Sequence, residues 1–132
     1  MTGFQGIRPF LGVDDVKATA EWYRDVLGFQ ILATLEEPDG EWAWVSLRRD
    51  DVGLMFNEHH THEDEPGADH VHPPPTLTGS LYINVDDVDA LAAAIAGKAA
   101  LDYGPTDQPH GMREIALEDP NGYFLIFGQP LS

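Results

Sequence analysis

The side chains best suited to chemistry gather in one stretch of the sequence. Residues 59–78 hold five of the six histidines, several acidic residues and a run of three prolines. Four of these histidines are spaced as pairs of imidazole ligands, which could hold zinc or nickel if the stretch folded back on itself: His59, His62, His70 and His72. The composition is typical of an exposed linker without a rigid element to hold ligands in place. A plain linker is therefore favoured over a metal site, and a lid over a neighbouring cleft is a third interpretation.

The elements on either side of this stretch must position any other functional side chain, and they repeat. Val13-Asp14-Asp15-Val16 returns as Val85-Asp86-Asp87-Val88, a spacing of 85 − 13 = 72 residues. Each copy follows a short apolar run and begins a helix-like segment. We therefore expect two similar modules within one structural domain, at residues 1–58 and 79–132, joined by the linker 59–78.

The first module has the order strand, helix, strand, strand, strand. Residues 5–12 alternate like a strand. Asp14 or Asp15 caps a helix that Gly28 ends. Strands follow at residues 29–35, 41–49 and 52–57, with a turn at Pro38-Asp39-Gly40 between the first two.

The second module repeats this order. Residues 80–85 form a strand, and Asp86 or Asp87 caps a helix that ends near Gly97. A short strand near residues 101–103 leads into a loop through residue 111. Residues 112–118 and 123–127 form a hairpin around an Asn-Gly turn.

Alternation assigns each strand a buried face and a face that lines a cleft. In the first strand, Ile7, Leu11 and Val13 are expected to pack under the helix, as are Leu81, Ile83 and Val85 in the second module. A slip of one residue would invert any strand's contribution. The expected cleft residues are Arg8, Phe10, Trp42, Trp44, Ser46, Met55, Asn57, Ser80, Tyr82, Asn84, Met112, Glu114, Phe124 and Ile126.

Composition narrows the classes of partner. The formal net charge is −16, which repels nucleic acid and attracts cationic small molecules, although acidity also serves solubility alone. The chain lacks cysteine and the roughly 18 consecutive apolar residues of a membrane helix, and Met1 opens no signal-like segment. We expect a cytoplasmic protein with neither a nucleic acid nor a membrane as partner.

Several motifs resemble those of one known family. They are the repeated Val-Asp-Asp-Val, the segment Trp22-Tyr23-Arg24-Asp25-Val26-Leu27-Gly28-Phe29, and Asp119-Pro120-Asn121-Gly122-Tyr123. Together they resemble the vicinal oxygen chelate superfamily, which includes glyoxalase I, bleomycin-resistance proteins and extradiol dioxygenases. The resemblance implies an α+β fold of paired βαβββ modules that form a cleft, and commonly a homodimer.

The resemblance also bears on metal binding. Metalloenzymes of this superfamily hold a divalent ion through His or Glu side chains on the first and last strands of each module. The corresponding positions here are Arg8, Met55, Ser80 and Ile126. None of these side chains is a good ligand for such an ion, and arginine would repel it. The sequence therefore predicts no metal or other cofactor at the usual site. It leaves the metal-free branch, whose bleomycin-resistance members sequester a cationic drug in a cleft at the dimer interface.

The expected cleft has an aromatic lining, which suits stacking with planar, often cationic compounds. Arg8 and Glu114 are its charged residues. They could meet a ligand carboxylate and a ligand cation, or they could pair with each other and only shape the cleft. His110 is expected to be a surface or hydrogen-bonding residue rather than a catalyst. The predicted ligand-binding residues are Arg8, Phe10, Trp44, Met55, Ser80, Tyr82, Glu114 and Ile126.

The predicted function is sequestration of a small, partly aromatic and cationic compound. The alternative is a lyase, isomerase or dioxygenase-like enzyme of the same fold that is metal-independent or uses unpredicted metal ligands. A third interpretation is a module whose exposed aromatic residues bind another protein. Whether the chain is an enzyme stays open at this point.

Overall fold

The computed structural model describes residues 2–58 and 77–132, so the predicted linker metal site at His59, His62, His70 and His72 lies outside the described residues. The order strand, helix, strand, strand, strand occurs twice. The elements are β1 (Phe10–Val13), α1 (Val16–Leu27), β2 (Gln30–Glu36), β3 (Trp42–Arg49), β4 (Val52–Glu58), β5 (Leu81–Asn84), α2 (Val88–Ile95), β6 (Tyr103–Asp107), β7 (Met112–Glu118) and β8 (Phe124–Pro130).

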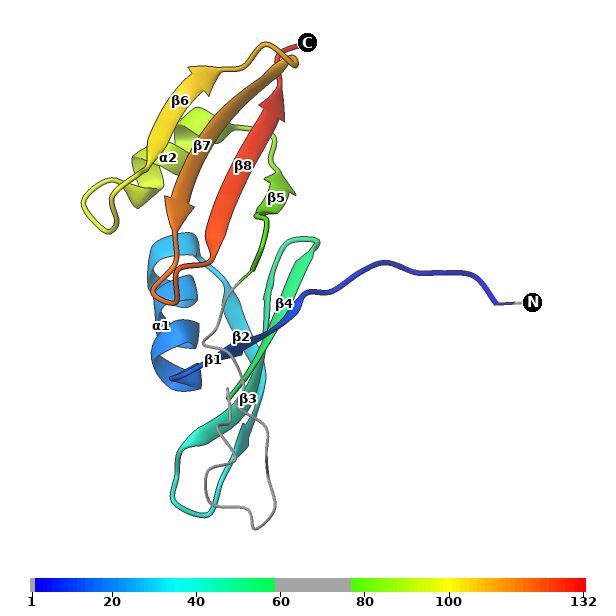
Figure 1. The fold of residues 1–132 in the computed structure, drawn as a ribbon, viewed down its shortest axis with the longest axis vertical. Coiled ribbons are helices and arrows are strands. Elements are labelled where there is room, and N and C mark those ends of the chain that lie inside the picture. The colour runs from blue at the N-terminus through cyan, green and yellow to red at the C-terminus, as the bar shows by residue number, and fades with distance from the viewer. Residues whose placement is uncertain (1, 59–76) are drawn as a thin grey trace.

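The strands form two four-stranded sheets that follow one another along the long axis of the molecule (Figure 1). The first sheet has the order β1-β4-β3-β2 and the second β5-β8-β7-β6. In each sheet the first and last strands of the repeat pair in parallel, and the remaining neighbours are antiparallel. The expected α+β fold is confirmed, with α1 beside the first sheet and α2 beside the second.

Both helices begin at the second aspartate of the repeated Val-Asp-Asp-Val motif. The Asp15 side chain accepts a hydrogen bond of 2.9 Å from the backbone N–H of Ala18, and Asp87 does the same for Ala90 at 3.0 Å. These bonds satisfy N–H groups that have no partner within the helix. Gly28 ends α1 with a φ of 72°, a conformation that costs glycine little.

The core lies between each helix and the sheet beside it. The first sheet and α1 enclose the buried side chains of Ala20, Tyr23, Leu27, Val45, Leu47, Leu54 and Phe56. The second sheet and α2 enclose Val88, Ile95, Ile115, Leu117, Leu125 and Phe127. Burial of each large apolar side chain contributes about 1.5–3 kcal/mol, so alternation along the strands largely fixes which face meets the helix.

The expected start of the first strand is wrong. Residues 2–7 form an arm that leads away from the sheet (Figure 1), and Ile7 is 97% exposed rather than part of the core. Two features of the backbone oppose an earlier strand. Pro9 has no N–H to donate to a neighbouring strand, and Gly6 adopts a φ of 134°.

The expected side for Trp42 is also wrong. Its ring packs against the core on the α1 side, with the Lys17 ammonium 5.8 Å from the ring centre. The pairing of β2 with β3 shifts register between Trp44 and Trp42, which admits an additional residue and inverts the alternation. Trp44 therefore lies on the opposite face from Trp42. In the second module, β6 runs through Asp107, where a loop was expected after residue 103.

Candidate functional site

The face of the second sheet opposite α2, hereafter the open face, carries the polar side chains of interest. On β7, Arg113 points toward α2, where its guanidinium bonds the Asp89 carboxylate at 3.0 Å. Its neighbour Glu114 must therefore lie on the open face. The open face is formed by Tyr82, Tyr103, His110, Met112, Glu114, Ala116, Phe124 and Ile126.

Glu114 is the centre of a hydrogen-bonded cluster. Its side chain is only 4% exposed. The hydroxyl of Tyr82 donates to Oε2 at 2.7 Å, and the hydroxyl of Tyr103 donates to Oε1 at 2.9 Å. Nε2 of His110 lies 2.8 Å from Oε2. An ionised carboxylate has no proton to give, so we assign the N–H to Nε2. Three donors from β5, β6 and the β6–β7 turn thus meet on one carboxylate.

These contacts determine the charge of the cluster. Burial raises the pKa of Glu114, but the hydrogen bonds from Tyr82, His110 and Tyr103 outweigh it and hold the pKa below its ordinary value. Burial, followed by the bond to Glu114, raises the pKa of Tyr82 and of Tyr103 to about 12. At neutral pH the carboxylate is therefore ionised and both phenols keep their protons.

Two glycines make room for this arrangement. A Cβ at Gly128 would collide with the ring and hydroxyl of Tyr82, so the tyrosine ring lies directly on the backbone of β8. At Gly104, which has a φ of 92°, a Cβ would collide with the carbonyl oxygen of Glu114. Glycine at these positions lets β6 and the Tyr82 ring approach the centre of the cluster closely.

The corresponding face of the first sheet is apolar and aromatic. Phe10 pairs with Met55 and is 51% exposed, while the half-buried Trp44 pairs with Asn57. The Arg8 side chain lies over Gly53, where a Cβ would come within 3.2 Å of it. This face therefore offers aromatic surface bordered by one cation.

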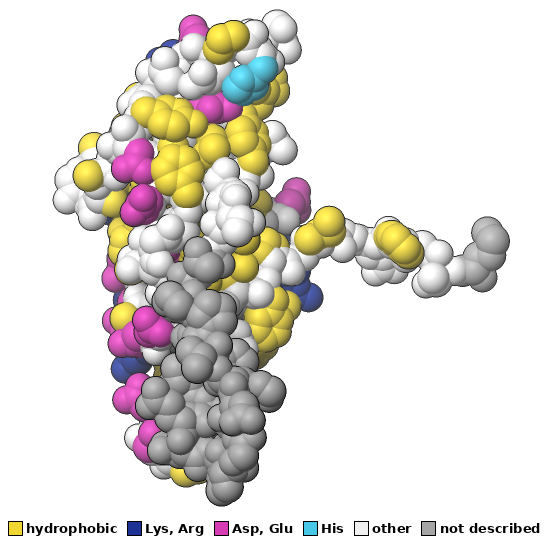
Figure 2. All heavy atoms as spheres, in the orientation of Figure 1, with side chains coloured by type: hydrophobic (Ala, Val, Ile, Leu, Met, Phe, Trp, Pro, Cys, Tyr) yellow, Lys and Arg dark blue, Asp and Glu magenta, His cyan; other side chains and the backbone are white. Residues whose placement is uncertain are grey.

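The predicted ligand-binding residues fall into two groups on separate sheets. Phe10, Trp44 and Met55 belong to the first sheet, with Arg8 just before β1, whereas Tyr82, Glu114 and Ile126 belong to the second, with Ser80 just before β5. The interpretation in which Arg8 pairs with Glu114 is wrong within this chain, because Glu114 is bonded by two tyrosines and a histidine. In Figure 2, hydrophobic side chains surround an acidic and a histidine side chain over the second sheet.

Sequence reasoning missed Tyr103. It expected His110 to be a surface or hydrogen-bonding residue, which agrees with its exposed side chain and its contact with Glu114, although that partner was not predicted. Tyr103 was expected to end a short strand before a loop, so its side-chain direction was not assigned. The sequence held one signal for the His110 contact, the tight turn at Gln108-Pro109-His110-Gly111. This turn reverses the chain between β6 and β7 and brings the His110 side chain to Glu114, four residues later.

The positions where the resemblance places metal ligands do not suit a divalent ion. They supply a guanidinium, a thioether, a hydroxyl and a hydrocarbon, from Arg8, Met55, Ser80 and Ile126. Within residues 2–58 and 77–132, no three His, Asp or Glu side chains group so that they could hold a metal ion.

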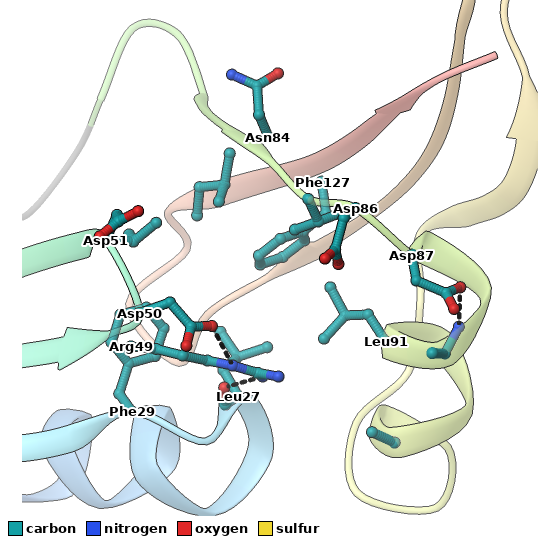
Figure 3. Close-up of a pocket in the computed structure, with 15 residues that line it drawn as sticks. Leu27, Phe29, Arg49, Asp50, Asp51, Asn84, Asp86, Asp87, Leu91 and Phe127 are labelled. Carbon is teal, nitrogen blue, oxygen red and sulfur yellow. Dashed lines mark hydrogen bonds and ion pairs between the residues drawn. The ribbon is translucent and has the colours of Figure 1, made fainter. Parts of the chain in front are cut away.

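A cavity of about 480 Å³ lies between the two halves, away from the open face. Figure 3 shows Asp50 and Asp86 on opposite sides of it, with Phe127 between them, and the apolar Phe29 and Leu91 also line it. Much of its polar rim is already used within the chain: Asp87 caps α2, and the Arg49 guanidinium donates to the Leu27 carbonyl at 2.7 Å. The predicted ligand-binding residues are absent from its lining. We therefore place the candidate site on the open face.

In the described part of the chain, neither helix combines the length and apolar content needed to cross a membrane.

Comparisons with known proteins agree with this fold. A model of the Glyoxalase/Bleomycin resistance protein/Dioxygenase superfamily matches residues 7–127. Lactoylglutathione lyase of Haemophilus influenzae is 30% identical over 133 residues, covering 93% of this chain and 90% of that protein. The structure of TnmS3, an antibiotic binding protein from Streptomyces sp. CB03234, matches with a TM-score of 0.71 and 25% identity over 98% of this chain and 99% of that one. The structure of the bleomycin-binding protein of Streptomyces verticillus, solved with copper(II)-bleomycin, matches with a TM-score of 0.67 and 27% identity over 98% of each chain.

Proposed function

The chain belongs to the Glyoxalase/Bleomycin resistance protein/Dioxygenase superfamily, and we propose that it binds and sequesters a small, partly aromatic and cationic compound. The observation that carries this proposal is the ionised Glu114 within an aromatic open face. An aromatic wall with a buried, fixed negative charge complements a flat ligand that carries a positive charge. The antibiotic-binding relatives support the same class of function.

The proposed binding unit is a homodimer in the cytoplasm. Small-molecule sites usually enclose most of their ligand's surface, which a single open face cannot do. Pairing the open face of one subunit with the aromatic face of its partner's first sheet would enclose a ligand from both sides. Phe10 on β1 and Tyr82 on β5 support this pairing. Both strands lie at the edge of their sheets, where Phe10 is 51% exposed and Tyr82 is 42% exposed.

The second candidate function is catalysis, as a lyase or isomerase of the same fold. The similarity to lactoylglutathione lyase favours it, and an ionised Glu114 could serve as a general base. The side chains at Arg8, Met55, Ser80 and Ile126 weigh against a metal-dependent version. Sequestration is therefore the leading proposal.

Titration with copper(II)-bleomycin and with the planar cation proflavine, followed by tryptophan fluorescence, tests the proposal. We expect saturable binding that Trp44→Ala weakens by about 1–3 kcal/mol, because stacking on a ligand contributes that much. Trp42→Ala is the matched control, since Trp42 packs on the α1 side and should leave the affinity unchanged. Absence of binding by both probes would contradict the proposal.

Metal content distinguishes a metal-dependent form of the second function from sequestration. Untagged protein is dialysed against divalent ions and then against metal-free buffer, and its metal is measured by elemental mass spectrometry. Retention of about one ion per subunit, together with turnover that a chelator abolishes, would make catalysis the leading function.

A further inference from the structure

One of the three donors to Glu114 differs from the other two in how firmly it is held. Tyr82 lies on β5 with its ring against the backbone at Gly128, and Tyr103 lies on β6. His110 instead lies on the turn between β6 and β7, with 58% of its side chain exposed. The imidazole can rotate into solvent without moving a strand, whereas the ring of Tyr82 is confined by the sheet beneath it.

We propose that the His110 imidazole occupies the place of the ligand's cationic group, and that a bound ammonium or amidinium displaces it from Oε2 of Glu114. The inference rests on the proposed function, since it concerns the same open face, and it specifies the ligand chemistry. The ligand's N–H groups replace the Nε2–H donor, while the bonds from Tyr82 and Tyr103 remain in place.

The energetics of the buried carboxylate select for charge. When His110 leaves, Glu114 keeps two donors but loses the third, and an under-satisfied buried carboxylate is costly. A ligand cation replaces the lost bond and also neutralises the charge. A neutral hydroxyl replaces only the bond. The nearby cation Arg113 is bonded to Asp89 and Asp107, so it does not serve this carboxylate.

The tyrosine hydroxyls reinforce this preference. Because each donates its proton to Glu114, its oxygen faces a ligand only as an acceptor. Acceptors grouped around a carboxylate suit a group with several N–H donors. The adjoining Tyr82 is 42% exposed, and its ring offers a surface for stacking. The geometry therefore favours a planar aromatic ring that carries a protonated amine or amidine.

Two probes of nearly the same shape test the inference: 1-naphthylmethylamine, which is protonated at neutral pH, and 1-naphthalenemethanol, which is neutral. Binding is measured by calorimetry. We expect the amine to bind the native protein about tenfold more tightly than the alcohol, as charge-assisted hydrogen bonds contribute about 1.4 kcal/mol or more. Glu114→Gln should remove this difference.

His110→Ala is the decisive variant. Removing the competing imidazole should raise the affinity for the amine roughly three- to tenfold, the worth of one ordinary hydrogen bond. Gln108→Ala, on the same turn, is the matched control and should leave that affinity unchanged. Imidazole ¹⁵N chemical shifts supply an independent readout. The His110 signal is identified by its absence from the spectrum of His110→Ala. On addition of the amine to the native protein, this signal should shift toward the position of a solvent-exposed imidazole.

The outcomes separate this inference from the function beneath it. Weaker or unchanged amine binding in His110→Ala would overturn the displacement mechanism. Equal binding of amine and alcohol by the native protein would overturn the charge preference while small-molecule binding stands. If the native protein binds none of the four compounds (the naphthyl amine, the naphthyl alcohol, copper(II)-bleomycin and proflavine), both the inference and the proposed function are overturned.

Discussion

The hydroxyl of Tyr23 donates a 2.7 Å hydrogen bond to Oδ2 of Asp119, across 96 positions of the sequence. Both residues are buried, and the other carboxylate oxygen of Asp119 accepts the backbone N–H groups of Asn121 and Tyr123. One carboxylate therefore joins α1 in the first half to the β7–β8 turn in the second. Burial and the nearby Asp119 charge raise the pKa of Tyr23, so the phenol stays a donor at any ordinary pH.

We expect Tyr23→Phe to lower the free energy of unfolding by about 1.5–3 kcal/mol, the typical worth of a hydrogen bond to a charged group. Phenylalanine keeps the ring and removes only the donor. Urea unfolding of Tyr23→Phe, Asp119→Asn and the double variant measures the coupling between the two groups. Losses that simply add in the double variant would show that the bond does not join the halves energetically.

The repeated aspartates allow a matched test of helix capping. We expect Asp15→Ala and Asp87→Ala each to destabilise the protein by about 1 kcal/mol, because each removes an N-cap side chain. Their neighbours Asp14 and Asp86 are exposed and do not cap the helices, so alanine there should change the free energy of unfolding by much less. The free energies are compared by thermal unfolding. An equal loss for Asp14→Ala and Asp15→Ala, or for Asp86→Ala and Asp87→Ala, would contradict the assignment of the second aspartate as the cap.

Gly128→Ala should disturb the Glu114 cluster without altering any of its members. The added methyl group collides with the Tyr82 ring, and overpacking of this kind costs about 1–3 kcal/mol. In a Tyr82→Ala background the same substitution should cost much less, since the ring is gone. Gly79→Ala meets open space and is the control. Near-UV circular dichroism and urea unfolding would detect the displaced ring, and an equal cost in both backgrounds would refute the contact.

Acid should remove the contribution of Glu114 to stability. Its folded-state pKa lies below the ordinary value of 4.5, so its stabilising contribution is present above that value and is lost as the pH falls through the folded-state pKa. Glu114→Gln cannot ionise and lacks this pH dependence. Urea unfolding from neutral to acidic pH should therefore show the native protein losing its advantage over the variant below about pH 4.5. A constant difference would contradict the assigned direction.

The repeat carried most of what the sequence revealed about the fold. Val-Asp-Asp-Val marked both helix starts, and apolar alternation correctly assigned the buried faces of β4, β5 and β8. Alternation failed at Trp42 because a bulge depends on how β2 and β3 pair, which neither strand's own sequence states. It failed at Ile7 because an apolar pattern does not ensure that a strand has a neighbour.

The candidate site was less accessible from sequence for a related reason. Glu114 and Tyr82 were expected on one face from period-two alternation alone, and that expectation agrees with their hydrogen bond. Tyr103 required the register of β6 against β7, which shifts between Tyr103 and Thr106. The His110 contact required the shape of a four-residue turn. Both are three-dimensional relationships that single-strand patterns do not contain.

The strand pairings place Tyr82 and Glu114 at the same positions of the second sheet that Phe10 and Trp44 hold in the first. Phe10 pairs with Met55 as Tyr82 pairs with Ile126, and Trp44 pairs with Asn57 as Glu114 pairs with Gly128. A duplicated frame thus carries a hydroxyl and a carboxylate in one copy and the aromatic rings of Phe10 and Trp44 in the other. In the proposed cleft the two walls would differ in polarity although their backbones match. A ligand with one charged end would then bind in a single favourable orientation. Two nearly identical backbones would thus form a site that distinguishes the two ends of its ligand.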